Sequence, residues 1–219
     1  MAVERTTRAE HPLPAVLMHW AHVLALAVLI FTGFQLYYPF LMAPLGLIRA
    51  VHMTAAYVLL ITVVLRIYWA FFGAGSAGGG SSRLVPDWTH FAPERANKGQ
   101  ALETLKYYLF LRDTHPRSAK FNTLQKGTYV VWLLLIIGAA ATGFALWGPT
   151  GQILLPRAYT FGGPVWMRSL HYLIMWGFIC TLMIHIYLSF AEASAQVWIM
   201  FLWKTNGGPA RPPAQREHA

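Results

Sequence analysis

Long apolar runs separated by polar segments dominate the pattern of hydrophobic positions along this chain. Four runs, at about 16–38, 48–72, 124–147 and 166–190, each reach the length of roughly 20 residues that an α-helix needs to cross about 30 Å of hydrocarbon. The pattern therefore predicts an all-α integral membrane protein, built as a four-helix transmembrane bundle.

A polar segment of about fifty residues separates the second and third runs. It opens with the flexible sequence GAGSAGGGSS and contains one amphipathic stretch, ALETLKYYLFLR at 101–112. Because it is too polar to cross a bilayer, we expect a long loop between helices two and three. We assign residues 1–204 to a single membrane domain and residues 205–219 to a disordered cytoplasmic tail.

Composition and charge agree with this interpretation. The chain is 56% hydrophobic and 11% charged, which is typical of a membrane protein. Its net charge of +9 does not indicate nucleic-acid binding, because the lysines and arginines lie between the spans and not in one basic domain. They concentrate in both termini and the middle loop, so we expect these parts to face the cytoplasm, with the four spans in the bacterial inner membrane.

The cysteine content restricts the redox chemistry. Cys180 is the single cysteine, so the chain has no internal disulfide and no thiolate set for an iron–sulfur cluster. It also has no C-x-x-C-H motif for covalent haem attachment. Any redox cofactor is therefore held without a covalent bond to the chain.

Histidines inside the spans carry the candidate chemistry. His171 and His185 are 14 residues apart in the fourth span, which places them within about 40° of one helix face and about 21 Å apart along the axis. In the predicted orientation, His52 of the second span is level with His171, and His19 of the first span is level with His185. We call His52 and His171 the outer pair, and His19 and His185 the inner pair.

Two neutral imidazoles from facing helices can occupy both axial positions of a haem b, without any cysteine. Iron with both axial positions filled is suited to electron transfer and has no open position for a substrate. The two pairs therefore predict two haem b groups. The alternative is a haem-free transporter or scaffold, in which the histidines bond other helices, relay protons or bind a metal.

Three further residues in or near the spans are candidates for cofactor contacts. His22 lies one turn beyond His19 and competes with it as the first ligand; we prefer a hydrogen bond, or a contact with a haem propionate or quinone. Arg66, 14 residues after His52, points toward the inner haem and is a candidate propionate partner, as is Arg49 near the outer haem. Snorkelling to the interface is the alternative for both arginines.

These motifs resemble the b-type cytochrome subunits (gamma subunits) that anchor respiratory nickel–iron hydrogenases and formate dehydrogenases to the membrane. The resemblance covers nearly all of residues 15–204. It rests on the spacing of His171 and His185 and on four stretches: MHW at 18–20, RAVHMTAAYVLL followed by RIYWAFFG at 49–73, LKYYLFLR at 105–112, and KFNTLQKGTY at 120–129. RIYWAFFG and LKYYLFLR are closer to the hydrogenase branch, and KFNTLQK is closer to the formate dehydrogenase branch.

The resemblance implies the same ligand pairs, His19 with His185 and His52 with His171. It also implies a quinone site, for menaquinone or ubiquinone, beside the inner haem near Asn122. Asn122 and Gln125 lie where the middle loop re-enters the membrane, and a side-chain amide there can donate a hydrogen bond to a quinone carbonyl. Asn122 is equally suited to capping the third span.

The implied function is electron transfer between membrane quinone and the iron–sulfur and catalytic subunits of a periplasmic oxidoreductase. The chain itself has no dehydrogenase chemistry, and its remaining surface contacts membrane lipid. A free-standing b-type cytochrome quinone reductase that oxidises a small reductant such as superoxide is the alternative within the same chemical class.

Overall fold

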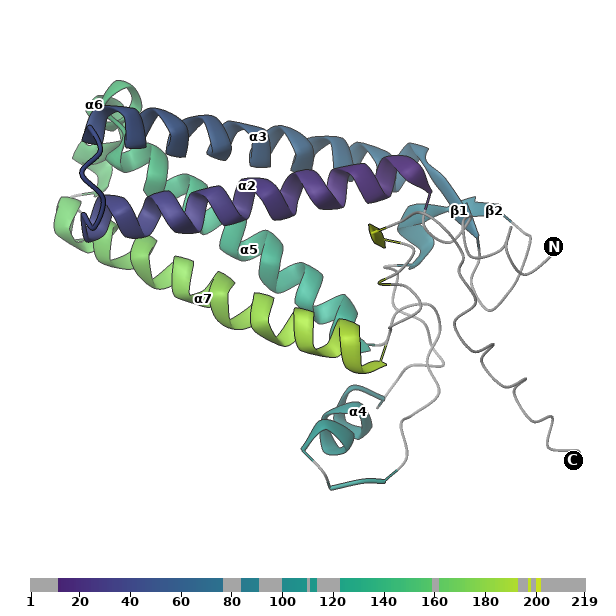
Figure 1. Ribbon diagram of the computed structural model, residues 1–219. Coiled ribbons are helices and arrows are strands. Elements are labelled where there is room, and N and C mark those ends of the chain that lie inside the picture. Colours follow the sequence, from purple (N-terminus) through teal and green to yellow (C-terminus); the bar gives the residue numbers. More distant parts are fainter. Residues whose placement is uncertain are drawn as a thin grey trace, which may run out of the picture.

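The computed structural model describes residues 12–76, 84–90, 100–109, 111–113, 123–158 and 162–192, together with residues 197, 200 and 201. Four long helices form a bundle in which each helix runs opposite to the one before it (Figure 1). They are α2 (Leu13–Tyr37), α3 (Leu45–Phe72), α5 (Thr123–Leu146) and α7 (Gly163–Glu192). Within the described ranges, these four are long and apolar enough to cross a membrane. The prediction of an all-α integral membrane bundle is confirmed.

The ends of α2 and α3 follow from local chemistry. Pro14 lies in the first turn of α2. The backbone N–H groups of a first turn have no acceptor within the helix, so the N–H that proline lacks costs no hydrogen bond there. At the end of α3, the backbone N–H of Gly73 donates to the carbonyl of Trp69 at 2.7 Å. A Cβ at position 73 would lie 2.5 Å from both the Trp69 carbonyl oxygen and its ring. Only glycine therefore allows the chain to leave α3 in this direction.

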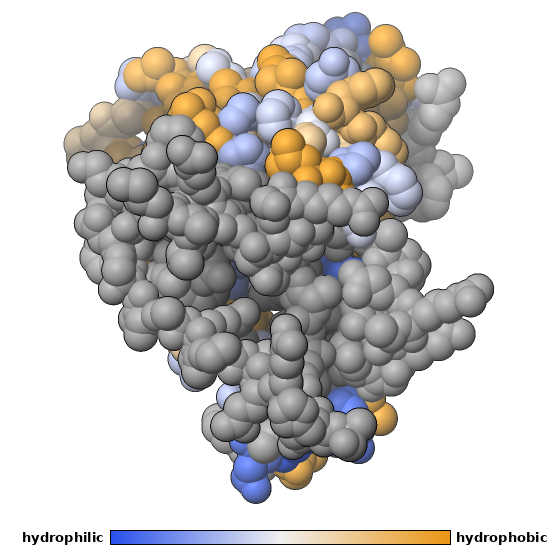
Figure 2. All heavy atoms as spheres, turned by 90° about the vertical axis from the view of Figure 1, so that its right-hand side faces the viewer, coloured by the Kyte–Doolittle hydropathy of each residue, from blue (hydrophilic) through white to orange (hydrophobic). Residues whose placement is uncertain are grey.

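A small antiparallel hairpin follows α3. It consists of β1 (Ala74–Ser76) and β2 (Leu84–Pro86), with Gly75 opposite Val85, and it leads into the 3-10 turn η1 (Asp87–His90). Figure 2 looks at this end of the molecule, where apolar and polar described side chains lie side by side in the upper part of the view.

A short helix in the middle segment, α4 (Gln100–Tyr108), begins at the predicted amphipathic stretch. The Lys106 ammonium donates a hydrogen bond to the Glu103 carboxylate at 2.9 Å, and Arg112 donates a second at 2.6 Å. These bonds hold the pKa of Glu103 below its ordinary value, with Lys106 the larger cause. Glu103 of this helix is therefore bonded both by Lys106 of the same helix and by Arg112, which follows it.

The bundle is made of two helix pairs. α2 packs mainly on α3, and α5 packs on α7 and on α6 (Gly148–Ala158), the short helix at the far end from β1 and β2 (Figure 1). α5 and α7 approach closely at Gly138 and Gly177, where an added Cβ would lie 3.1 Å from a side-chain carbon of the other helix. Small residues of this kind let membrane helices pack by van der Waals contact.

The two helix pairs meet largely across rings. Tyr37 of α2 stacks on Tyr172 of α7 with ring centroids 4.1 Å apart, and Phe34 lies 5.8 Å from Trp176. The loop that follows α2 is ordered by Gln35, which is fully buried. Its amide donates to the Leu41 carbonyl and accepts from two backbone N–H groups of that loop. This packing places the faces that carry the histidines opposite each other.

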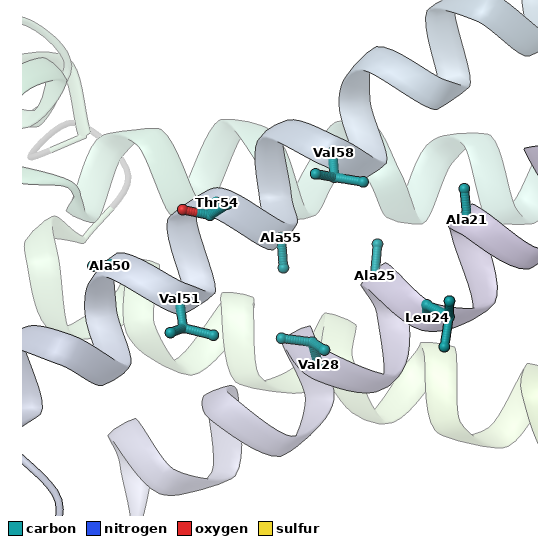
Figure 3. Close-up of a pocket in the computed structure, with 9 residues that line it drawn as sticks. All are labelled: Ala21, Leu24, Ala25, Val28, Ala50, Val51, Thr54, Ala55 and Val58. Atoms are coloured by element: carbon teal, nitrogen blue, oxygen red, sulfur yellow. The ribbon is translucent and has the colours of Figure 1, made fainter.

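An open apolar groove of about 390 Å³ lies along α2 and α3 (Figure 3). It is lined by Ala21, Leu24, Ala25, Val28, Ala50, Val51, Thr54, Ala55 and Val58. Many larger apolar side chains on the helices are exposed, for example Leu24 at 65%. Such surfaces are suited to the hydrocarbon of a bilayer, because a helix satisfies the hydrogen bonds of its own backbone groups.

Candidate functional site

The outer pair lies between α3 and α7. The ring centroids of His52 and His171 are 6.3 Å apart, with an interplanar angle of 63°. A glycine of a neighbouring helix lies beside each ring. A Cβ on Gly143 would lie 3.2 Å from Cε1 of His171, and one on Gly33 would lie 3.8 Å from Cε1 of His52. The two glycines therefore leave room against the imidazoles.

Each histidine of the outer pair also contacts a threonine of the adjacent helix. Thr32 Oγ1 lies 2.8 Å from Nδ1 of His52, and Thr142 Oγ1 lies 2.8 Å from Nδ1 of His171. Both threonines are buried, with 2% and 4% exposure. Sequence reasoning did not assign these contacts. The only signal along the chain was a polar residue inside each apolar run, which does not reveal the partner.

The inner pair lies between α2 and α7, near the opposite end of the bundle. The rings of His19 and His185 are again 6.3 Å apart, with an interplanar angle of 53°. Tryptophans flank both rings: Trp20 lies 5.7 Å from His19, and Trp132 of α5 lies 5.6 Å from His185. Aromatic rings and apolar helices therefore surround this pair.

The spacing within each pair fits a haem iron. Metal–imidazole bonds of about 2.0 Å on opposite sides of one metal place two ring centres roughly 6 Å apart. Both pairs have this spacing, and each joins imidazoles from facing helices, which is the ligand set of a six-coordinate haem b. The donor chemistry and the room beside the rings both suit that group.

His22 has a different environment from His19. The backbone of Thr62 of α3 lies beside it, and its Nε2 is buried without a hydrogen-bond partner among the described residues. The ring that lies against His185 is that of His19. This geometry favours His19 as the ligand of the first span and a helix-to-helix contact for His22.

We therefore expect His22→Ala to retain the haem content of the unmodified chain, because His22 lies against α3 and does not face the other imidazole of the pair. The measurement is the haem-to-protein ratio of the purified variant, with His19→Ala as the matched comparison one turn away. If His22→Ala loses a haem and His19→Ala keeps it, His22 is the ligand of the first span and His19 is not.

The predicted propionate partners lie in different settings. The Arg66 guanidinium forms an ion pair with the Asp87 carboxylate at 2.7 Å, with side-chain exposures of 29% and 8%. The backbone N–H of Asp87 also donates to the carbonyl of Gly73. Arg66 thus ties η1 to α3, and its role toward a propionate stays a prediction. Arg49 is exposed near the start of α3.

The predicted quinone residues are only partly within the described structure. Asn122 lies outside the described residues, immediately before α5. Gln125 lies in the first turn of α5, and its side chain is outside the described part. α5 continues from these positions to Trp132, whose ring contacts His185. The backbone thus places Gln125 toward the inner-pair end of the bundle.

Four helices of membrane-spanning length that carry facing histidines define a membrane-bound b-type cytochrome. The chain belongs to the family described as prokaryotic cytochrome b561, whose sequence model matches residues 10–202. It is a multi-pass bacterial membrane protein, and membership of this family implies haem b.

Relatives agree with that family. The chain is 29% identical over 198 residues to the probable Ni/Fe-hydrogenase B-type cytochrome subunit of Cupriavidus necator, covering 82% of this chain and 77% of the relative. It is 30% identical to the protein of that name in Azotobacter vinelandii, covering 82% and 78%. The probable Ni/Fe-hydrogenase 1 B-type cytochrome subunit of Escherichia coli K12 is 27% identical, over 82% and 80%. The resemblance to hydrogenase b-type cytochrome subunits is confirmed.

Proposed function

We propose that this chain is a di-haem b cytochrome that transfers electrons between a nickel–iron hydrogenase and membrane quinone. The observation that carries the proposal is the repeated geometry of the two histidine pairs, each with ring centroids 6.3 Å apart, in a chain of a b-type cytochrome family. The function of a haem-free transporter does not require both pairs to have the spacing of two axial ligands.

The chain's own residues would hold both cofactors. His52 and His171 would bind one haem, and His19 and His185 the other; each bound haem supplies a one-electron carrier. Two imidazoles for each haem would keep small molecules from the metal. His171 and His185 lie about 21 Å apart along α7, so the pairs provide two successive levels across the membrane.

The partner follows from the relatives. They carry hydrogenase names, so we propose the iron–sulfur and catalytic subunits of a hydrogenase before those of a formate dehydrogenase. With both termini in the cytoplasm, the outer pair and α6 would face the periplasm, and the partner would dock at that end of the inner-membrane protein.

The quinone would bind near the inner pair. α5 begins at Thr123, and Trp132, whose ring contacts His185, lies about 13 Å further along the helix axis. A neutral amide at Asn122 or Gln125 suits this boundary, since it can donate to a quinone carbonyl without the desolvation cost of a charge. His22 is the further candidate at this end.

In membranes that contain the chain and its partner, hydrogen should reduce the b-type haems and then quinone. Asn122→Ala should slow the reduction of quinone several-fold while leaving the haem spectra and the reduction of the haems by hydrogen unchanged. The measurement is hydrogen-dependent quinone reduction beside optical spectra of the same membranes.

The matched control is Asn122→Ser, because serine retains the ability to cap a helix and lacks the amide. A serine variant as slow as the alanine variant supports quinone binding. If both variants reduce quinone at the normal rate, Asn122 only caps α5, and the site is to be sought around His22. If formate reduces the haems and hydrogen does not, the partner is a formate dehydrogenase. If the membranes show no b-type absorption bands, the haem-free transporter is the remaining alternative.

A further inference from the structure

We propose that Thr32 and Thr142 are positioning residues that hold both outer-pair histidines in the tautomer whose Nε2 faces the iron. The proposal rests on the proposed function, since it concerns how the chain prepares the ligands of one haem. It goes beyond that function by assigning roles to two residues that are not proposed as ligands.

The hydrogen bonds of Thr32 determine the proton position on His52. Thr32 Oγ1 lies 2.6 Å from the carbonyl oxygen of Val28 and 2.8 Å from Nδ1 of His52. A hydroxyl has one proton, and a carbonyl oxygen can only accept. The hydroxyl therefore donates to Val28 and accepts from Nδ1–H of His52. With its proton on Nδ1, the ring has a free lone pair on Nε2.

The same arrangement occurs independently on the other side of the pair. Thr142 Oγ1 lies 2.7 Å from the carbonyl oxygen of Gly138 and 2.8 Å from Nδ1 of His171. By the same argument, the hydroxyl donates to Gly138 and accepts from the histidine. Thr142 is on α5 and His171 on α7, whereas Thr32 is on α2 and His52 on α3. Each ligand is thus held by a threonine of the neighbouring helix.

The contact with histidine distinguishes these two threonines from others in the spans. Thr62 and Thr181 also donate to the carbonyl four residues earlier, each at 2.8 Å, as is common for threonine in helices. Neither of their hydroxyls contacts a histidine of the two pairs. Thr181 lies on α7 between His171 and His185, and it provides a matched control.

The inner pair has no such arrangement in the described part of the chain, where ring contacts, not side-chain hydrogen bonds, surround His19 and His185. A hydrogen bond from the non-ligating nitrogen fixes the ring orientation and raises the basicity of the ligating nitrogen. A more basic ligand stabilises the ferric state and lowers the reduction potential. The threonines therefore make the two histidine pairs chemically unequal.

The test is an optical redox titration of the purified chain with Thr32→Val, Thr142→Val and the double variant. Valine keeps the branched shape and removes the hydroxyl. We expect the midpoint potential of the outer haem to shift in the positive direction in each single variant and further in the double variant, with haem retention about tenfold weaker. The inner haem should keep its potential. Thr32→Ser and Thr142→Ser should restore both properties, and Thr181→Val should change neither.

Failure of this inference is separable from failure of the proposed function. If His52→Ala loses a haem while both valine variants retain the normal outer potential, the ligand assignment stands and the threonine role is wrong. Equal shifts at the outer haem for Thr181→Val would also overturn the role. If His52→Ala loses no haem, the proposed function itself fails. Thr32 and Thr142 lie on different helix pairs. If the protein with one substitution does not accumulate in cells, the single variant at the other threonine is therefore enough for the test.

Discussion

Replacing His171 by alanine should remove one haem and leave the other, and replacing His185 by alanine should remove the complementary one. The two imidazoles belong to different pairs and lie about 21 Å apart along α7, so neither can replace the other as a ligand. The haem-to-protein ratio should fall from two to one in each variant. The remaining α-band in reduced spectra should differ between them.

Cys180→Ala is the matched control for this pair, because Cys180 lies between the two histidines on α7 and is exposed. It should retain both haems. The double variant of His171 and His185 should lose all b-type absorption. A ratio near one in the unmodified chain, with a His171→Ala spectrum identical to it, would contradict the two-haem proposal and leave His171 as a helix contact.

Replacing Gly143 by leucine should remove the outer haem by a steric route. A Cβ alone would lie 3.2 Å from Cε1 of His171, so the larger side chain must displace the ring from its place opposite His52. The α5 helix itself should tolerate the change, since leucine is a better helix former than glycine by about 0.8 kcal/mol. We expect the outer haem to be lost and the inner haem to be retained, measured by the haem-to-protein ratio.

Gly127→Leu provides the comparison on the same helix, because a Cβ there would meet no atom within 4 Å among the described residues. It should retain both haems. If Gly143→Leu also retains both, the space beside His171 is not required for the haem, and the close approach of α5 and α7 serves helix packing alone.

Arg66 shows how a charged residue in a span can acquire a role that its spacing does not reveal. Its position relative to His52 pointed toward the inner haem, whereas the structure pairs its guanidinium with the Asp87 carboxylate of η1. A partly buried charge is offset by an opposite charge nearby. That partner comes from a turn beyond the span, so no periodicity within α3 indicates it.

The sequence by itself determined the class of fold and the level of each histidine. A span needs only length and apolar composition, and the rise of a helix places His171 and His185 at two depths; both are local properties. The four helices and the family confirm the class of fold. The structure also brings the imidazoles of each pair together, while their role as haem ligands stays a prediction.

Only the tertiary structure decided which faces of the helices meet. Membrane-spanning helices are apolar nearly all round, so their sequences carry little sign of which side contacts a neighbour. The contacts of Thr32 with His52, of Thr142 with His171 and of Arg66 with Asp87 join residues 20 or more positions apart. They depend on the rotation of each helix about its axis, which packing between helices sets and local sequence does not.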